Sequence, residues 1–198
     1  MKYYSLISPR VYAPRINSMR IVGGIYKRRL ITYPDDASHI RPTKDRVREA
    51  IFSALGDLTD YVGLDLYSGS GAMGIEGLSR GCSFMTFVDI NKLAIEVTKK
   101  NISSLNIKNA QVLFMSDESA IKEFINKKKQ FDIIFLDPPY KLGQYEKIIS
   151  LLVENDLLSN RGIIVIESDH DIVINDEYFA RRRDYKYGEI KVSILWRK

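Results

Sequence analysis

The pattern of apolar residues along the chain becomes regular from about residue 62. Short apolar runs of strand length then alternate with longer segments in which apolar residues recur every three or four positions. This alternation is typical of βα units, and nearly continuous apolar strands indicate a parallel sheet covered by helices on both faces. The expected strands are 62–67, 84–89, 111–115, 131–137 and 162–167, and the expected helices are 72–80, 92–104, 118–128 and 144–155.

Two further strand-like segments, 178–185 and 190–196, lie on either side of Tyr187-Gly188. We expect a turn at this dipeptide, so that the two strands close the sheet and at least one of them runs antiparallel. The predicted fold class is therefore α/β, with a doubly wound, mostly parallel sheet of seven strands.

The N-terminal segment has a different pattern. Residues 1–18 carry two prolines and no periodicity, whereas an apolar and basic alternation from Met19 reaches Gly23-Gly24 and resumes through Thr32. A glycine pair between alternating segments predicts a small β-hairpin that turns at the two glycines. The predicted organisation is a leader over 1–18, a basic hairpin and linker over 19–43, and a Rossmann-like domain over 44–198.

The positive charge of the chain is unevenly distributed. The net charge is +5, but residues 1–50 hold eleven Lys and Arg against four Asp and Glu, a net charge of +7. Such asymmetry is expected of a surface that binds phosphate backbones, and a solvated basic arm is the alternative. The candidate nucleic-acid contacts are Arg20, Lys27, Arg28, Arg41 and Arg46.

Composition excludes several classes of protein. Hydrophobic residues make up 45% of the chain, with no apolar run of membrane-spanning length and no signal-peptide pattern, so we expect a cytoplasmic protein. The single cysteine, Cys82, permits neither an intramolecular disulfide nor a cysteine-cluster metal site. His39 has no second ligand at metal spacing either, so we expect no metal.

A glycine-rich loop follows the first strand of the regular region. The stretch Ser68-Gly69-Ser70-Gly71, continued to Gly74, reads G-x-G-x-x-G between a predicted strand and a predicted helix. Its glycines allow a ligand to approach the backbone. Asp89 ends the next strand, twenty residues after Gly69, and a carboxylate at this position can accept hydrogen bonds from ribose hydroxyls. This arrangement favours a ligand that contains adenosine, and a purely structural turn is the alternative.

Two more carboxylates narrow the choice of ligand. Asp65, four residues before the first glycine, would repel a dinucleotide pyrophosphate but suits the ammonium group of S-adenosylmethionine. Asp117, just past the third strand, can accept from the adenine amine, or it can cap the following helix, a task that Ser116 could share.

The strand Phe131–Leu136 ends in Asp137-Pro138-Pro139-Tyr140. The two prolines stop the strand, because neither offers a backbone N–H and each fixes φ. The result is a rigid tip of hydrogen-bond acceptors beside an aromatic ring, which suits a planar amine. An ordinary Asp-Pro turn is the alternative.

This tip, following the glycine loop, resembles the Asn/Asp-Pro-Pro-aromatic signature of class I S-adenosylmethionine-dependent methyltransferases that act on amino groups of nucleic-acid bases. Further stretches resemble the RsmD family of bacterial 16S rRNA guanine-N2 methyltransferases. These stretches are 19–24, 41–49, 68–81 and 186–188. Members of that family often carry Glu where this chain has Asp89.

The resemblance implies direct methyl transfer from S-adenosylmethionine to a guanine N2 amine, with Asp137 and the Pro138 carbonyl accepting its hydrogens and Tyr140 stacking on the extruded base. The implied partner is 16S rRNA within a small-subunit ribonucleoprotein, and the protein is expected to be a monomer. A DNA adenine-N6 methyltransferase and a non-catalytic RNA-binding module with an adenosine site remain as alternatives.

Overall fold

The computed structural model describes residues 16–34, 45–138 and 144–198. The strands are β1 Ile16–Arg20, β2 Leu30–Pro34, β3 Val62–Asp65, β4 Phe84–Asp89, β5 Ala110–Phe114, β6 Phe131–Leu136, β7 Leu158–Ser168, β8 Phe179–Tyr187 and β9 Ile190–Arg197. The helices are α1 Asp45–Leu55, α2 Ala72–Ser79, α3 Lys92–Ser104, α4 Asp117–Asn126, α5 Gln144–Glu154 and a short 3₁₀ turn, Asp176–Tyr178.

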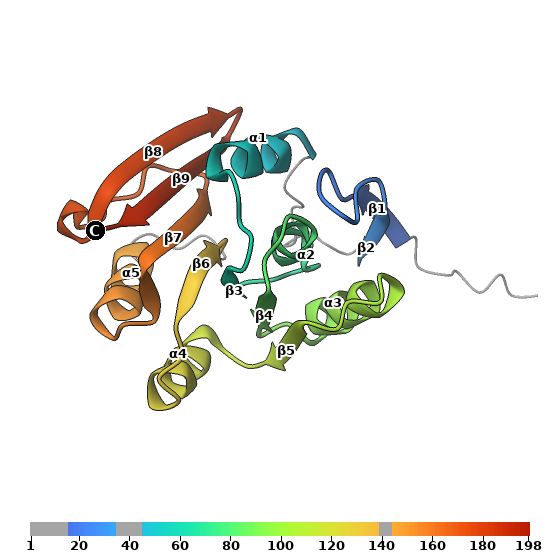
Figure 1. The fold of residues 1–198 in the computed structure, drawn as a ribbon, viewed down its shortest axis with the longest axis horizontal. Coiled ribbons are helices and arrows are strands. Elements are labelled where there is room, and N and C mark those ends of the chain that lie inside the picture. Colours follow the sequence, from blue (N-terminus) through green and yellow to red (C-terminus); the bar gives the residue numbers. More distant parts are fainter. Residues whose placement is uncertain (1–15, 35–44, 139–143) are drawn as a thin grey trace, which may run out of the picture.

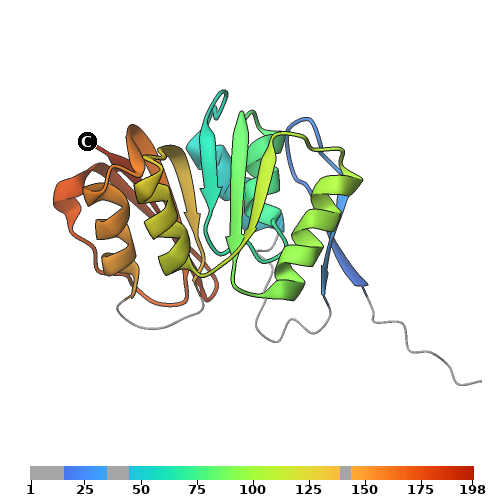
Figure 2. The same cartoon turned by 90° about the horizontal axis from the view of Figure 1, so that it is seen from below.

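The main sheet has seven strands in the order β5-β4-β3-β6-β7-β9-β8 (Figures 1 and 2). Strands β3 to β7 are parallel, whereas β9 pairs antiparallel with both β7 and β8. The predicted α/β class and the closing antiparallel strand are thereby confirmed. Since β8 and β7 are both antiparallel to β9, β8 runs in the same direction as the parallel strands.

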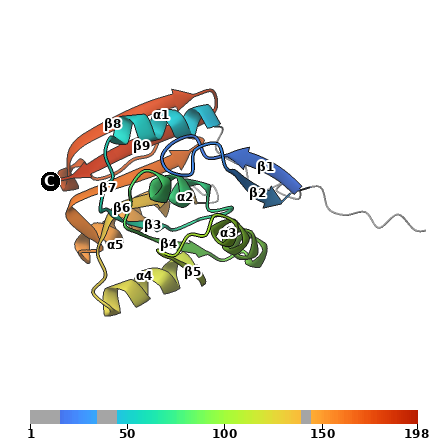
Figure 3. The ribbon, with the colours of Figure 1, turned by 45° about the vertical axis from the view of Figure 1, so that its right-hand side comes forward.

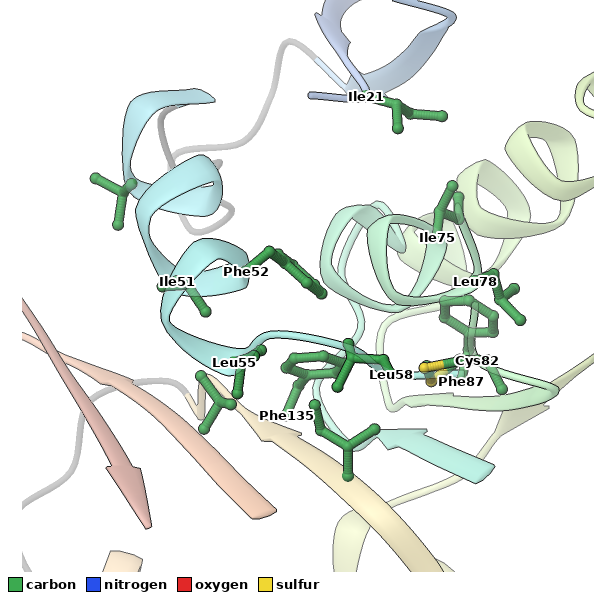
Figure 4. Close-up of a cluster of buried hydrophobic side chains, with 14 of the residues drawn as sticks. Ile21, Ile51, Phe52, Leu55, Leu58, Ile75, Leu78, Cys82, Phe87 and Phe135 are labelled. Atoms are coloured by element: carbon green, nitrogen blue, oxygen red, sulfur yellow. The ribbon is translucent and has the colours of Figure 1, made fainter. Parts of the chain in front are cut away.

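Helices cover both faces of this sheet, and two hydrophobic clusters fill the space beneath them. The strands contribute side chains to both clusters, because alternate side chains point to opposite faces of the sheet. In β6, Ile133 and Phe135 belong to the first cluster, and Ile134 and Leu136 belong to the second. The first cluster also receives side chains from α1, α2 and the hairpin, and Figure 4 shows Phe52 of α1 beside Phe135. The second is covered by α4 and α5.

Strands β1 and β2 form the predicted antiparallel pair, but the predicted turn is wrong. The strands pair from Ile16↔Pro34 to Arg20↔Leu30, and a loop over 21–29 joins them. This loop crosses to α2, where the buried Glu76 carboxylate accepts from the backbone N–H groups of Val22 and Gly23 at 2.9 and 2.8 Å. The glycine pair therefore belongs to a docking loop and not to a two-residue turn.

Close approach to α2 explains the second glycine of the pair. Gly24 has φ +71°, and a Cβ placed there would lie 1.7 Å from the Ser79 carbonyl oxygen. The neighbouring contacts fix this position, since Ile25 N–H donates to the same oxygen at 2.8 Å and Tyr26 N–H donates to Ser79 Oγ at 2.9 Å. Only glycine meets both the backbone and the space requirements.

No helix within the described ranges is both long enough and apolar enough to cross a membrane.

The two requirements on Gly24 can be separated by substitution. Gly188 also has a positive φ, +67°, but open space surrounds the position that its Cβ would occupy. We expect Gly188→Ala to lower the free energy of unfolding by about 1 kcal/mol through backbone strain alone, and Gly24→Ala to lower it by about 3 kcal/mol or more because overpacking is added. Urea unfolding of both variants measures the difference, and equal losses would contradict the close packing described here.

Candidate active site

The pairing of β3 with β6 defines the centre of the candidate site. Asp65 at the end of β3 is in register with Phe135, and Leu66 N–H donates to the Phe135 carbonyl at 3.2 Å. After β3 the chain continues into α2 on the first face, and after β6 it continues towards α5 on the other face (Figure 1). The carboxyl ends of these strands thus form a topological switch point, where α/β sheets bind ligands.

The glycine-rich loop joins β3 to α2 and is held by side chains of α3. Gly69 and Gly71 have φ +53° and +80°, which suits glycine. Thr98 Oγ1 donates to the Gly69 carbonyl, and Asn101 Nδ2 donates to the Ser70 carbonyl, both at 2.9 Å. These bonds fix the loop in the conformation that opens α2.

Asn101 also connects the loop to the N-terminal hairpin. Its side chain is 1% exposed, accepts from Thr32 N–H at 2.9 Å and donates to the Thr32 carbonyl at 2.9 Å. One buried amide therefore links β2 with the Ser70 backbone. The sequence analysis missed this residue, because a lone Asn within a helix carries no recognisable signal.

Ser68 supplies evidence for a ligand at this loop. Its side chain is 7% exposed, and among the described residues its Oγ has no hydrogen-bond partner. A buried hydroxyl without a partner is costly in a protein interior, so a partner from a bound ligand is the natural explanation.

Asp65 lies beneath the loop and is almost fully buried. Its Oδ2 accepts from Gly74 N–H, near the start of α2, at 3.0 Å. Burial, the largest cause, together with the charge of Asp89 raises the pKa of Asp65 to about 7, although the hydrogen bond from Gly74 N–H acts in the opposite direction. A cation bound nearby would favour the ionised form, which is the property expected of a carboxylate that faces an ammonium group.

Asp89 has a structural task that the sequence did not reveal. Its Oδ2 accepts from Gly69 N–H and its Oδ1 accepts from Asn91 N–H, both at 2.8 Å. The carboxylate thus ties the end of β4 to the glycine loop. Its expected contact with ribose hydroxyls stays a prediction.

Asp117 is the first residue of α4 but does not serve as its cap. Ser116 takes that role, accepting from Ser119 N–H at 3.2 Å. Asp117 Oδ2 instead accepts from the Tyr67 hydroxyl at 2.6 Å. Burial and this hydrogen bond raise the pKa of Tyr67. Tyr67 was missed by the sequence analysis, although its position two residues before the first glycine places it at the same edge.

Asp137 follows the last residue of β6, and Pro138 after it is buried. Burial is the largest cause that raises the pKa of Asp137 well above its usual range, followed by the charges of Glu167 and Asp65. Glu167, near the end of β7, is thus a further acidic neighbour of Asp137. The sequence analysis missed it, although a carboxylate near the end of an apolar strand is a recognisable signal. Pro139 and Tyr140 lie outside the described residues.

The predicted nucleic-acid contacts are distributed over the hairpin and α1 (Figure 3). Arg20, Lys27, Arg28 and Arg46 are exposed, and Arg41 lies outside the described residues. Arg20 Nε is 3.8 Å from Asp45 Oδ2. This contact brings the end of β1 to the first turn of α1, which carries Arg46.

Arg48, by contrast, has a structural role, since it is 1% exposed. It donates to the Arg20 carbonyl at 2.5 Å and to Asp45 Oδ1 at 2.9 Å.

Comparison with known proteins identifies the family. The family model described as "Conserved hypothetical protein 95" matches residues 19–196. The chain belongs to this family. The matched residues include every stretch that resembles the RsmD family, and curated relatives are named ribosomal RNA small subunit methyltransferase D.

Ribosomal RNA small subunit methyltransferase D of Escherichia coli (strain K12) is 35% identical over 152 residues, covering 76% of this chain and 75% of that protein. The putative rRNA methyltransferase YlbH of Bacillus subtilis (strain 168) is 37% identical over 173 residues, covering 84% of this chain and 94% of that protein.

Solved structures agree with this assignment. The putative methyltransferase yhhF from Escherichia coli superposes with a TM-score of 0.81 at 31% identity, covering 92% of this chain and 99% of that one. A second solved structure is the Thermus thermophilus 16S rRNA N2 G1207 methyltransferase RsmC in complex with AdoMet and guanosine. It superposes with a TM-score of 0.67 at 22% identity, covering 96% of this chain and 52% of that one. The fold is that of S-adenosylmethionine-dependent methyltransferases, and the RsmD-family chain described here is an enzyme of this class.

Within the described ranges, no group of three or more His, Cys, Asp or Glu side chains is arranged to hold a metal ion.

The buried Asp65 predicts a pH-dependent stability. Its carboxyl has a pKa of about 7 in the folded protein, so the native state binds this proton more tightly than the unfolded chain does. Without ligand, the stabilisation is complete below about pH 4 and is lost as the pH rises through 7, a change of up to about 4 kcal/mol. We expect Asp65→Asn to remove this dependence and to stabilise the ligand-free protein at pH 8 more than at pH 4, as measured by urea unfolding.

Asp60→Asn provides the control, since Asp60 is exposed and its positive φ of 66° suits asparagine equally well. If Asp65→Asn increased the free energy of unfolding equally at pH 4 and pH 8, the raised pKa of Asp65 would be contradicted.

Proposed function

We propose that this protein transfers the methyl group of S-adenosylmethionine to the exocyclic N2 amine of a guanine in 16S rRNA. The observation that carries this proposal is the register of β3 and β6, which brings the glycine loop and Asp137 to the same edge of the sheet. Membership of the RsmD family supports the choice of substrate, because curated relatives are named rRNA small subunit methyltransferases.

The residues at the edge fit S-adenosylmethionine. The glycine loop accepts close approach, Ser68 Oγ offers a buried hydroxyl, and Asp65 lies where an ammonium group would stabilise its ionised form. Asp89 is assigned to the ribose and Asp117, supported by Tyr67, to the adenine amine. When bound, S-adenosylmethionine supplies a methyl group activated by a positive sulfonium.

Asp137 and the Pro138 carbonyl would orient the amine. The N2 lone pair of guanine is delocalised into the ring, which makes the amine a weak nucleophile. Two acceptors on its two hydrogens localise this pair and aim it along one direction. Tyr140 is assigned to stacking on the base, and positioning together with desolvation supplies most of the acceleration.

The substrate context is part of the proposal. We assign the exposed basic residues of the hairpin and α1 to the rRNA backbone, with the small-subunit ribonucleoprotein as the form in which the rRNA is recognised. The protein is expected to act as a cytoplasmic monomer.

A transfer assay distinguishes this function from its alternatives. Protein incubated with labelled S-adenosylmethionine should label 16S rRNA, naked or in small subunits, and mass spectrometry of the digested RNA should identify N2-methylguanine. Label confined to duplex DNA would overturn the proposal in favour of an adenine-N6 enzyme. Cofactor binding with no label in any nucleic acid would indicate a binding module.

Asp137 can be tested by two substitutions. We expect Asp137→Ala to lower kcat by at least about a hundredfold, since a hydrogen-bond acceptor at the reacting amine is removed, while S-adenosylmethionine binds as before. Asp137→Asn keeps a carbonyl acceptor and should retain more activity than Asp137→Ala. Unchanged turnover in Asp137→Ala would refute the assigned role, and the measurements are single-turnover rates and calorimetric binding of the cofactor.

The hairpin is tested by charge reversal. Arg20→Glu combined with Arg28→Glu should weaken rRNA binding and reduce the slope of log K against log salt concentration by roughly 0.7 for each phosphate that is no longer neutralised. An unaltered slope would assign these two residues to a merely solvated surface. Filter binding at several salt concentrations provides the measurement.

A further inference from the structure

The C-terminal hairpin is a second concentration of positive charge. Residues 179–198 hold seven Lys and Arg against two Asp and Glu, a net charge of +5, whereas residues 51–178 hold twelve against nineteen, a net charge of −7. An acidic central region is thus flanked by two basic ends of the chain. The N-terminal end is part of the proposed rRNA-binding surface, whereas the C-terminal end has no role in the proposed mechanism.

Strand register brings this hairpin to the catalytic edge. Leu136, the last residue of β6, is paired with Ile166, and the next residue of β7, Glu167, is paired with Val192 of β9, which in turn is paired with Tyr185 of β8. Asp137 and Tyr185 therefore lie in about the same row, and three strand spacings of about 4.8 Å separate their backbones by roughly 14 Å. Because β8 runs parallel to β6, residues 186 and 187 extend further towards the same edge.

The side chains at this end of β8 include an ordered aromatic pair. The rings of Tyr185 and Tyr187 are stacked with centroids 6.3 Å apart and planes at 14°, and both pack beside the first hydrophobic cluster while remaining partly exposed. That cluster also contains Ile133 and Phe135, so the alternation of β6 directs Asp137 to the same face of the sheet. The aromatic pair and the catalytic tip therefore share a face.

An exposed cation accompanies the two rings. Arg183 alternates with Tyr185 and Tyr187 on the same face of β8, is exposed, and has no ion pair within the described ranges. Lys186 belongs to the opposite face, where the hydrogen bond from Lys191 and the charge of Lys186 both lower the pKa of Asp171. Arg182 pairs with Asp184 at 2.9 Å. Stacked aromatic rings beside an exposed cation form the kind of surface that binds single-stranded RNA, with bases on the rings and a phosphate at the cation.

We propose that the carboxyl half of β8, with Arg183, Tyr185 and Tyr187 on one face, is a second rRNA-binding surface that holds nucleotides flanking the target guanine. The inference rests on the proposed function. The β1–β2 hairpin lies beside α2 and α3, whereas β8 and β9 lie at the other side of the molecule (Figures 1 and 3). The 21–29 loop docks at Ser79, the last residue of α2, and so lies away from the catalytic edge, which leaves the end of β8 as the surface beside the target base.

Charge reversal tests the cation. Arg183→Glu should weaken binding of 16S rRNA about tenfold at 0.1 M salt and lower the salt slope, with S-adenosylmethionine affinity and thermal unfolding unchanged. The matched control is Lys129→Glu, which makes the same change of charge at an exposed position that precedes the amino end of β6, on the opposite edge. Equal binding by the two variants would overturn the proposal.

Substitution of Tyr187 tests the stacking. Tyr187→Phe keeps the ring and should retain wild-type kcat/KM for rRNA, whereas Tyr187→Leu should lower it about tenfold, the size of effect expected when a base–aromatic stack is removed. Thermal unfolding of both variants checks the packing against the first cluster. If the loss of kcat/KM in Tyr187→Leu were no larger than the loss of folded protein, the ring would have only a packing role. That result would overturn the proposed stacking of a base on Tyr187.

A photo-crosslinker at position 183, in protein mixed with assembled small subunits, identifies the partner. Crosslinks to rRNA support the proposal, and crosslinks only to ribosomal proteins would replace it with a protein-docking surface. If wild-type protein methylates no RNA at all, the proposed function itself fails. If methylation of guanine proceeds while the β8 variants behave as wild type, only the present inference fails.

Discussion

The parallel pairing of β3 with β6 is the constraint on which the site depends. These strands are separated by about seventy residues of sequence, yet Asp65 lies in register with Phe135, two residues before Asp137. The helices that follow the two strands pack on opposite faces, so the loops diverge and leave the strand ends accessible to ligands. A shift of register would separate the glycine loop from the acceptor tip and would also move the alternating side chains out of both hydrophobic clusters.

Buried polar side chains then connect the cofactor loop with the N-terminal hairpin. Glu76 accepts from the docking loop at the backbone of Val22 and Gly23, and Asn101 bonds both Thr32 and the Ser70 carbonyl. Such groups are satisfied only when hairpin, α2 and α3 are in place together, and leaving any of them unpaired would be costly. The segment assigned to RNA is therefore fixed to the same framework as the segment assigned to the methyl donor.

The charges of the molecule are divided in a way that suits the proposed reaction. Asp65, Asp137 and Glu167 form an acidic group at the strand ends, which favours a cationic sulfonium and an ammonium group. The same carboxylates repel RNA phosphates, so affinity for the substrate backbone has to come from elsewhere. In the proposed function this affinity is assigned to the two basic ends of the chain, so that the centre is left to a neutral base.

The sequence by itself determined the parallel α/β architecture, the closing antiparallel strands and the glycine loop, because each of these is encoded locally by apolar periodicity and by Gly and Pro. It also identified Asp65, Asp89, Asp117 and Asp137 as carboxylates that follow apolar strands. The family resemblance, carried by several motifs together, added the rRNA substrate that no single residue specifies.

Only the tertiary structure decided what Gly23-Gly24 is for, since the demand for glycine comes from Ser79 of a distant helix and not from the local turn. It also decided that Ser116 caps α4 while Asp117 accepts from Tyr67, and that Glu167 and the end of β8 lie in the row of Asp137. These relationships depend on strand register and helix packing between residues far apart in the chain. Local sequence patterns specify elements but not which elements become neighbours.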